Sequence, residues 1–301
     1  MNVPVGLAAL ALTRRHVPAG RATGPSPRLD LVGAGLVTAA LVALVLPLVE
    51  GPGEGWPWWS WGCQAAAAAL FAVLVPAQRR IAARGGSPIL PLALFAGRAF
   101  VVGLVNVVVF NASVASWFFV LALYLQDGRH LSPLRAGLVF SALSGGFLVT
   151  SLLAGRVLAS LGRQVLALGA GLRVLGLLAL WVVVREHGTG GDILWVVLPM
   201  AAEGAGQGLV TGPLVSRELL GVRPAVAGAG SGVLVSAQQV GNSIGVAVIG
   251  AVFFETRHSD GSVAAAFGVA LLLLAALSLA LAALVQLLPN TPAWGGWRRW
   301  L

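Results

Sequence analysis

The stretch Asp192–Glu218 reads DILWVVLPMAAEGAGQGLVTGPLVSRE. Its apolar part runs from Ile193 to Val215, about the length that a helix rising ~1.5 Å per residue needs to cross ~30 Å of hydrocarbon with some tilt. Glu203 and Gln207 lie one helical turn apart near its middle. A carboxyl group at that depth costs on the order of 3 kcal/mol to insert, so it usually has a partner, a water-filled cavity or a function. The stretch therefore predicts a helix that lines the cavity of a membrane transporter.

The composition predicts that the rest of the chain lies in lipid as well. Of 301 residues, 58% are hydrophobic and only 10% are charged, and the mean hydropathy is +0.91. A soluble domain averages about 25% charged residues. We therefore expect an all-α polytopic membrane protein whose main partner is the lipid bilayer.

The charged and reactive residues argue against other classes of protein. The net charge of +9 is the balance of nineteen arginines and ten acidic residues. Most of the arginines lie in loops between apolar runs, so the charge indicates membrane topology and no nucleic-acid partner. The single cysteine permits no internal disulfide. The four histidines fall in loops or at span edges, and no phosphate-binding loop or metal-ligand cluster occurs. We expect no enzyme activity, no cofactor and no metal.

Apolar runs recur at regular intervals along the chain. Residues 1–13 are too short to span and are expected to be the end of a truncated helix, followed by a loop at 14–28. Eight complete spans follow, at Leu29–Val49, Trp61–Gln78, Ala99–Tyr124, Leu134–Ala159, Val165–Val184, Ile193–Val215, Ala227–Phe254 and Ala264–Leu288.

The distribution of arginine predicts the orientation. One set of loops holds fourteen arginines and the other set holds four. Because cytoplasmic loops carry the excess of basic residues, the first set is placed in the cytoplasm. That set includes the loop 14–28, a linker at 79–95 and a tail at 289–301, so we expect a multi-pass protein of the cell membrane with a cytoplasmic C-terminus.

The spans divide into two groups. Residues 29–78 form a helical hairpin with few polar residues between its ends, and we expect it to be an accessory element. Residues 96–288 contain six spans rich in small and amide residues, and we expect them to form a six-helix domain.

Polar residues near mid-span are the candidate functional residues. They are Asn106, Asn111, Arg173, Glu203, Gln207, Gln238, Gln239 and Asn242. Buried amides in a membrane also serve simply to join helices by hydrogen bonds, and this reading stays open for every amide. Glu203 has two readings: it carries a coupling proton or contacts a cationic substrate, or it forms a structural ion pair with Arg173 of the preceding span.

Glycine pairs four residues apart indicate where helices approach closely. Gly228 and Gly232 form one such pair, and Gly241 and Gly245 form another, both in the seventh span. The run Gly204, Gly206 and Gly208 lies inside an apolar run with no strand before it, so it is no nucleotide-binding loop.

Several motifs together resemble one family of transporters. They are Asn2-Val3-Pro4-Val5-Gly6, Arg28-Leu29-Asp30-Leu31-Val32-Gly33, Tyr124-Leu125-Gln126 with Ser132-Pro133-Leu134-Arg135-Ala136-Gly137-Leu138, and the glycine-rich Ala227–Ala251. They are similar to motifs of the fourteen-helix drug:proton antiporters of the major facilitator superfamily, where they mark the end of helix six, the start of helix seven, the region around helices nine and ten, and helix thirteen.

The resemblance implies that this chain corresponds to helices seven to fourteen, with the hairpin 29–78 as the extra pair between two six-helix halves. The implied activity is efflux of small amphipathic compounds driven by proton entry, with the two halves rocking around a site at the membrane midplane. The spans with Asn111 and Glu203 would line the cavity, and the span with Gln238 would face the other half. The implied partners are the substrate, protons and a missing N-terminal half.

The chain also departs from the family pattern. The loop motif G-x-x-x-D-R-x-G-R-R has Ala159 in place of the acid and Ser160 in place of an arginine, and Gln238 stands where many members have arginine. We therefore carry two hypotheses: a C-terminal portion of an exporter that is not competent alone, or a non-transporting membrane subunit or gene remnant that pairs with another membrane chain.

Overall fold

The computed structural model describes residues 6–7, 9–10, 12–13, 30–51, 55–84, 86, 88–219 and 227–288. The described residues within 6–13 are helical. The predicted loop at 14–28 and the predicted tail at 289–301 lie outside the described residues.

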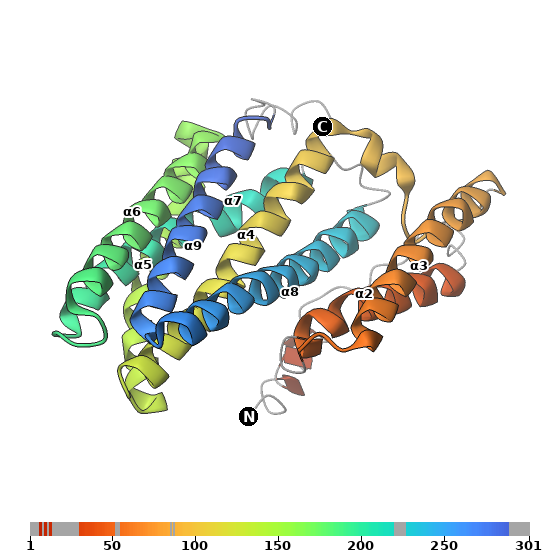
Figure 1. The fold of residues 1–301 in the computed structure, drawn as a ribbon. Coiled ribbons are helices and arrows are strands. Elements are labelled where there is room, and N and C mark those ends of the chain that lie inside the picture. The colour runs from red at the N-terminus through yellow and green to blue at the C-terminus, as the bar shows by residue number, and fades with distance from the viewer. Residues whose placement is uncertain are drawn as a thin grey trace.

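The described part of the chain contains eight long helices (Figure 1). They are α2 (Leu31–Glu50), α3 (Trp58–Ala83), α4 (Arg98–Leu123), α5 (Pro133–Leu161), α6 (Gln164–His187), α7 (Leu194–Leu219), α8 (Ala227–Asp260) and α9 (Val263–Val285). A short 3₁₀ helix, η2 (Leu92–Ala96), precedes α4, and a π-helical turn, η3 (Tyr124–Gly128), extends it.

Seven of the eight long helices in the described part are long and apolar enough to cross a membrane, so this is an all-α polytopic membrane protein. The remaining helix is α7, which was predicted to be the sixth span. Its composition is diluted by Glu203, Gln207 and a run of glycines, so its own apolar content does not establish that it crosses. A crossing by α7 stays a prediction.

Local capping signals set several helix ends. The Asp30 side chain accepts a hydrogen bond from Gly33 N and starts α2, and the Ser132 hydroxyl accepts one from Arg135 N at the start of α5. Gly162 and Gly188 end α5 and α6 with positive φ angles of 57° and 58°, which residues with a Cβ rarely adopt.

Some helices run further than the apolar spans predicted. Helix α3 continues past Gln78 to Ala83, so the start of the predicted linker 79–95 is helical, and α8 continues past Phe254 to Asp260. The reason is that backbone hydrogen bonds and good helix formers such as arginine continue a helix beyond the point where its side chains become polar.

Helices α4 to α9 pack into one group, and α2 and α3 form an antiparallel hairpin beside it (Figure 1). Within the group, α7 packs against both α5 and α6, α6 also packs against α9, and α4 lies against α8 and α9. The hairpin touches the group mainly where α2 meets α8.

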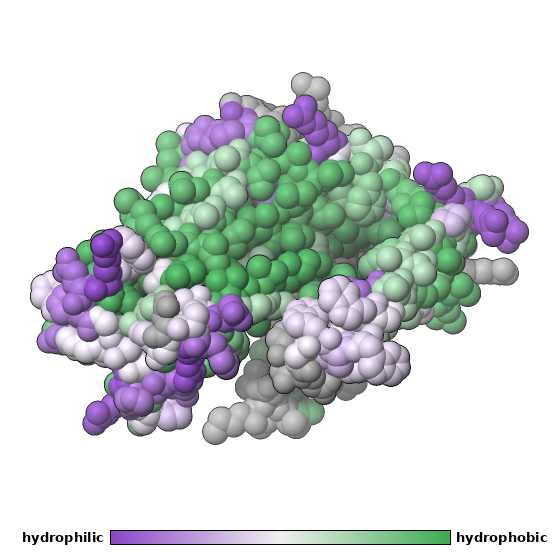
Figure 2. Space-filling model, viewed as in Figure 1, coloured by the Kyte–Doolittle hydropathy of each residue, from purple (hydrophilic) through white to green (hydrophobic). Residues whose placement is uncertain are grey.

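Hydrophobic residues cover the middle of the surface seen in Figure 2, and hydrophilic residues gather above and below them. Many large apolar side chains of the described residues are exposed, because lipid rather than water is their expected surrounding. Where the helices meet, aromatic rings fill one apolar core: Tyr124 stacks on Phe267 at 4.3 Å between ring centroids, and Trp117 stacks on the same ring at 6.3 Å.

Candidate functional site: a buried charge network between α4, α6 and α7

An ion pair joins consecutive helices at the centre of the six-helix group. The Nε atom of Arg173 on α6 donates to Oε1 of Glu203 on α7 at 2.8 Å, and the two side chains are 0% and 1% exposed. Of the two readings of Glu203, the structure therefore shows the ion pair. A role of Glu203 in proton movement or substrate contact stays a prediction.

Helix α4 completes the network around the arginine. The Nη2 atom of Arg173 donates to the Ser113 hydroxyl at 3.1 Å, and its guanidinium lies 5.3 Å from the centre of the Phe110 ring. A hydrogen bond and a cation–π contact together stabilise a guanidinium in a place where water cannot solvate it. One arginine of α6 thus contacts side chains of two other helices, α4 and α7.

The glycines of the quoted stretch explain how α7 comes so close to its neighbours. A Cβ on Gly204 or Gly208 would collide with backbone of α5, at Leu143 and Phe147, and a Cβ on Gly206 would collide with Gly169 and Arg173 of α6. Positions 204 and 208 are one turn apart and so share a face, which turns toward α5. The backbone of α7 thus lies close to both α5 and α6 around Glu203, whose side chain is buried.

Four buried polar atoms in this region have no hydrogen-bond partner among the described residues. They are Nη1 of Arg173, Oε2 of Glu203, Oε1 of Gln207 and Oδ1 of Asn106. Buried polar groups in proteins are almost always paired, so open ones are candidates for binding water, a proton or a polar ligand atom. Three of them belong to residues that the sequence singled out on α6 and α7.

The candidate asparagines of α4 bond to their own helix. The side-chain nitrogen of Asn106 donates to Val102 O at 2.8 Å, and that of Asn111 donates to Val107 O at 2.9 Å. Asn106 is fully buried, whereas Asn111 is half-buried. Neither amide makes a hydrogen bond to another described helix.

The candidate amides of α8 form a separate polar site. Asn242 donates from Nδ2 to Oε1 of Gln239 at 2.9 Å, and Gln238 is half-buried beside them in sequence. Within the described part of the chain no hydrogen bond joins these amides to Arg173 or Glu203. The structure therefore divides the sequence-predicted site into a buried charge network and an amide cluster on α8.

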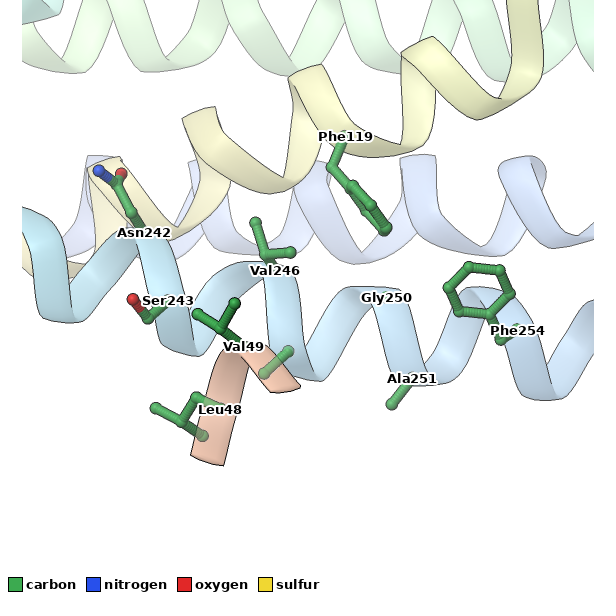
Figure 3. Close-up of a pocket in the computed structure, with 10 residues that line it drawn as sticks. Leu48, Val49, Phe119, Asn242, Ser243, Val246, Gly250, Ala251 and Phe254 are labelled. Atoms are coloured by element: carbon green, nitrogen blue, oxygen red, sulfur yellow. The ribbon is translucent and has the colours of Figure 1, made fainter. Parts of the chain in front are cut away.

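A groove of about 450 Å³ runs between α8 and the end of α2 (Figure 3). Asn242 and Ser243 lie toward one end of it, and Phe254 lies at the other. Leu48 and Val49 of α2 face α8 across it. The groove is therefore mostly apolar, with a polar end formed by α8.

The two glycine pairs of α8 differ in their surroundings. A Cβ on Gly241 would meet Val108 O of α4, and one on Gly245 would meet Ala112 O, so α4 packs directly on this pair. At Gly228 and Gly232 a Cβ would meet nothing within 4 Å. No described helix makes the close approach expected at Gly228 and Gly232, and both residues are exposed.

Sequence reasoning missed two contributors to the site. Phe110 looked like one more apolar residue of a spanning helix. Thr150 of α5 donates through its hydroxyl to Ala205 O of α7 at 2.7 Å and thereby bonds the backbone beside Glu203. The available signal for Thr150 was a polar pair, Thr150 and Ser151, in an otherwise apolar run. The described residues contain no group of three or more His, Cys, Asp or Glu side chains that could bind a metal ion.

Comparison with known proteins connects this arrangement to membrane transport. A probable actinorhodin transporter of Streptomyces coelicolor is 35% identical over 264 residues, covering 87% of this chain and 45% of the relative. A tetracenomycin C resistance and export protein of Streptomyces glaucescens is 31% identical, covering 86% of this chain and 47% of the relative. An uncharacterized MFS-type transporter of Mycobacterium tuberculosis is 28% identical, covering 85% and 43%. No family model matches the chain.

These homologues are named as a transporter, a resistance and export protein and an MFS-type transporter, not as enzymes, in agreement with the sequence motifs. The chain spans about half the length of the curated relatives it matches. The coarse assignment to membrane efflux transport thus stands on the homologues, while the activity of a whole protein does not follow from this part.

Proposed function

We propose that this chain is the C-terminal portion of a fourteen-helix exporter that moves small amphipathic compounds out of the cell in exchange for protons. The observation that carries the proposal is similarity over most of the chain to proteins named as transporters or export proteins, 87% of the chain in one and 86% in another. The buried charge network supports it, because ionisable residues deep in spanning helices are rare and mark substrate or ion pathways.

In such an exporter, the buried charge network and the amides of α8 would have different roles. Arg173, Glu203 and Ser113 tie α4, α6 and α7 together, so these helices would move as one block in an alternating-access cycle. The amides of α8, Gln238, Gln239 and Asn242, are accessible and would meet the substrate or the opposing half. Proton coupling, a location in the cell membrane and a cytoplasmic C-terminus are parts of the same proposal.

The first experiment measures efflux by membrane vesicles that contain the 301-residue chain, with ethidium as the substrate and a quenched weak base as the proton indicator. We expect no efflux from the chain alone, because one helix group has no opposing group to rock against. A chimera carries the N-terminal half of the actinorhodin transporter relative ahead of this chain, and it is expected to export ethidium and to collapse the proton gradient as it does so.

The matched control is the N-terminal half of the actinorhodin transporter relative expressed alone. Proton-driven efflux by the chain alone would overturn the claim that it is incompetent by itself. Absence of efflux from both the chain and the chimera would count against the exporter.

A second candidate function is a non-transporting membrane subunit. The observation in its favour is a set of uncovered small residues on the outside of the group: an added Cβ at Gly137 or Gly145 of α5, or at Gly228 or Gly232 of α8, would meet nothing within 4 Å. Small residues let helices of another chain approach closely in a membrane. Purification of the chain with a separate six-helix partner, in the absence of efflux, favours this function.

A further inference from the structure

Three elements meet in a polar cluster at the open end of the hairpin. Asp30, at the start of α2, accepts hydrogen bonds from Gly33 N at 2.6 Å and from Nε2 of Gln78 on α3 at 2.8 Å. It also accepts one from Ile89 N at 3.4 Å. Gln78 in turn accepts a hydrogen bond at Oε1 from Leu90 N at 3.0 Å. Asp30 and Gln78 thus bond the two helices of the hairpin to each other and to the segment that follows them.

The cluster is a built feature rather than a chance surface contact. The Gln78 side chain is buried, although glutamine is usually exposed, and both of its polar ends are used. A Cβ on Gly33 would collide with the Asp30 carboxylate and the Gln78 amide, so glycine is required there. This explains the spacing of Asp30 and Gly33 in the motif Arg28–Gly33 by local packing.

The segment held by the cluster is the linker 88–97, between the hairpin and the six-helix group. Its own structure is limited to the short helix η2, so few other hydrogen bonds fix its first residues. The next element is α4, whose first turn begins at Arg98 and packs Phe100 edge-on against Phe95 of the linker at 5.7 Å. Holding Ile89 and Leu90 therefore restricts where α4 can begin.

We propose that Asp30 and Gln78 form a fastener that fixes the linker 88–97 to the hairpin and so positions the start of α4. The hairpin is then attached to the six-helix group at two places: through this linker and where α2 packs against α8. Since Asp30 receives three hydrogen bonds, its carboxylate form is favoured and the fastener stays closed at neutral pH. The inference does not depend on the proposed export activity.

The test is hydrogen–deuterium exchange of the full 301-residue chain in lipid nanodiscs, read on the peptide that contains Ile89 and Leu90. In Asp30→Ala and in Gln78→Leu we expect exchange of this peptide to rise about tenfold, the factor appropriate to the loss of one or two hydrogen bonds. Asp30→Asn keeps acceptor atoms and is expected to lie between Asp30→Ala and the unmodified chain. Peptides from α6 and α9 are expected to exchange as before.

Glu50→Ala is the matched control, since it removes an exposed carboxylate from the other end of α2. Unchanged exchange of the linker peptide in both Asp30→Ala and Gln78→Leu would overturn the proposal. So would faster exchange throughout α6 and α9, because the cluster would then support the whole fold rather than the linker.

Discussion

Replacing Glu203 by leucine tests whether the two buried charges of Arg173 and Glu203 compensate each other. Removal of one partner of a buried pair typically costs about 3–5 kcal/mol, because the remaining charge is left uncompensated. In Glu203→Leu the remaining charge is the guanidinium of Arg173, which is 0% exposed and cannot give up its proton. We therefore expect the free energy of unfolding to fall by about 3–5 kcal/mol.

The converse substitution should cost less. In Arg173→Met the carboxyl of Glu203 is left without its cation, but a carboxyl group can take up a proton and become neutral. The structure also predicts the loss of the bond to Ser113, worth on the order of 1 kcal/mol. The double variant Arg173→Met with Glu203→Leu removes both charges at similar volume, and replacements of this kind are often neutral or stabilising by about 1–4 kcal/mol.

The assay is reversible unfolding of the chain in mixed micelles by increasing dodecyl sulfate, followed by tryptophan fluorescence. The three variants and the unmodified chain form a double-mutant cycle, with Glu255→Leu, which removes an exposed carboxylate of α8, as the control. Additive losses in the double variant, or a Glu203→Leu variant as stable as the control, would refute the reasoning that the two charges compensate each other.

Three further predictions follow from local geometry. Gly206→Ala should destabilise the chain by about 1–3 kcal/mol in the same assay, because the new methyl group would overlap α6, whereas Gly212→Ala on the same helix meets no atom within 4 Å and should not. Burial tends to raise the pKa of Asp30, but the hydrogen bonds from Gln78, Gly33 and Ile89 outweigh it and lower that pKa below 3.8. The Asp30 carboxylate therefore contributes its full stabilisation at a pH above the pKa of the unfolded chain, and this stabilisation is lost as the pH falls through the lowered pKa of the folded chain. The thermal midpoint of the unmodified chain should therefore approach that of Asp30→Asn only in acid below the folded-state pKa. Equal midpoints at neutral pH would contradict this prediction. Asp127→Asn breaks an ion pair of 3.0 Å with Arg257 whose side chains are 43% and 38% exposed, and it should change the unfolding free energy by less than about 1 kcal/mol; a larger loss would mean that this pair is coupled to the fold.

The positions of the helices were largely predictable from the sequence. Apolar length is a local property, and the predicted spans overlap the eight helices closely; Val165–Val184, for example, lies within α6 at 164–187. The errors fall at the ends, as at Ala83 and Asp260, where the helix continues in polar residues. Hydropathy marks where side chains prefer lipid, whereas a helix ends where its backbone hydrogen bonds end.

The candidate site was predictable only as a set of residues. The sequence marked Arg173, Glu203, Gln207 and the amides of α8 because polar groups at that depth are costly, but it left two readings of Glu203 open. The sequence offered a pair of Arg173 and Glu203 as one of those readings, but only the way the helices rotate against each other decides that these side chains, 30 positions apart, meet.

The sequence by itself determined that the chain is a membrane-embedded set of helices with an unusual carboxyl near the middle of one of them, because both facts rest on the composition of single segments. Only the tertiary structure decided that Gly204 and Gly208 turn toward α5 while Gly206 turns toward α6, and that Glu203 therefore meets Arg173 away from lipid. The physical reason is that close backbone contact on both sides of α7 sets its rotation, and that rotation selects the partner of every polar group it carries.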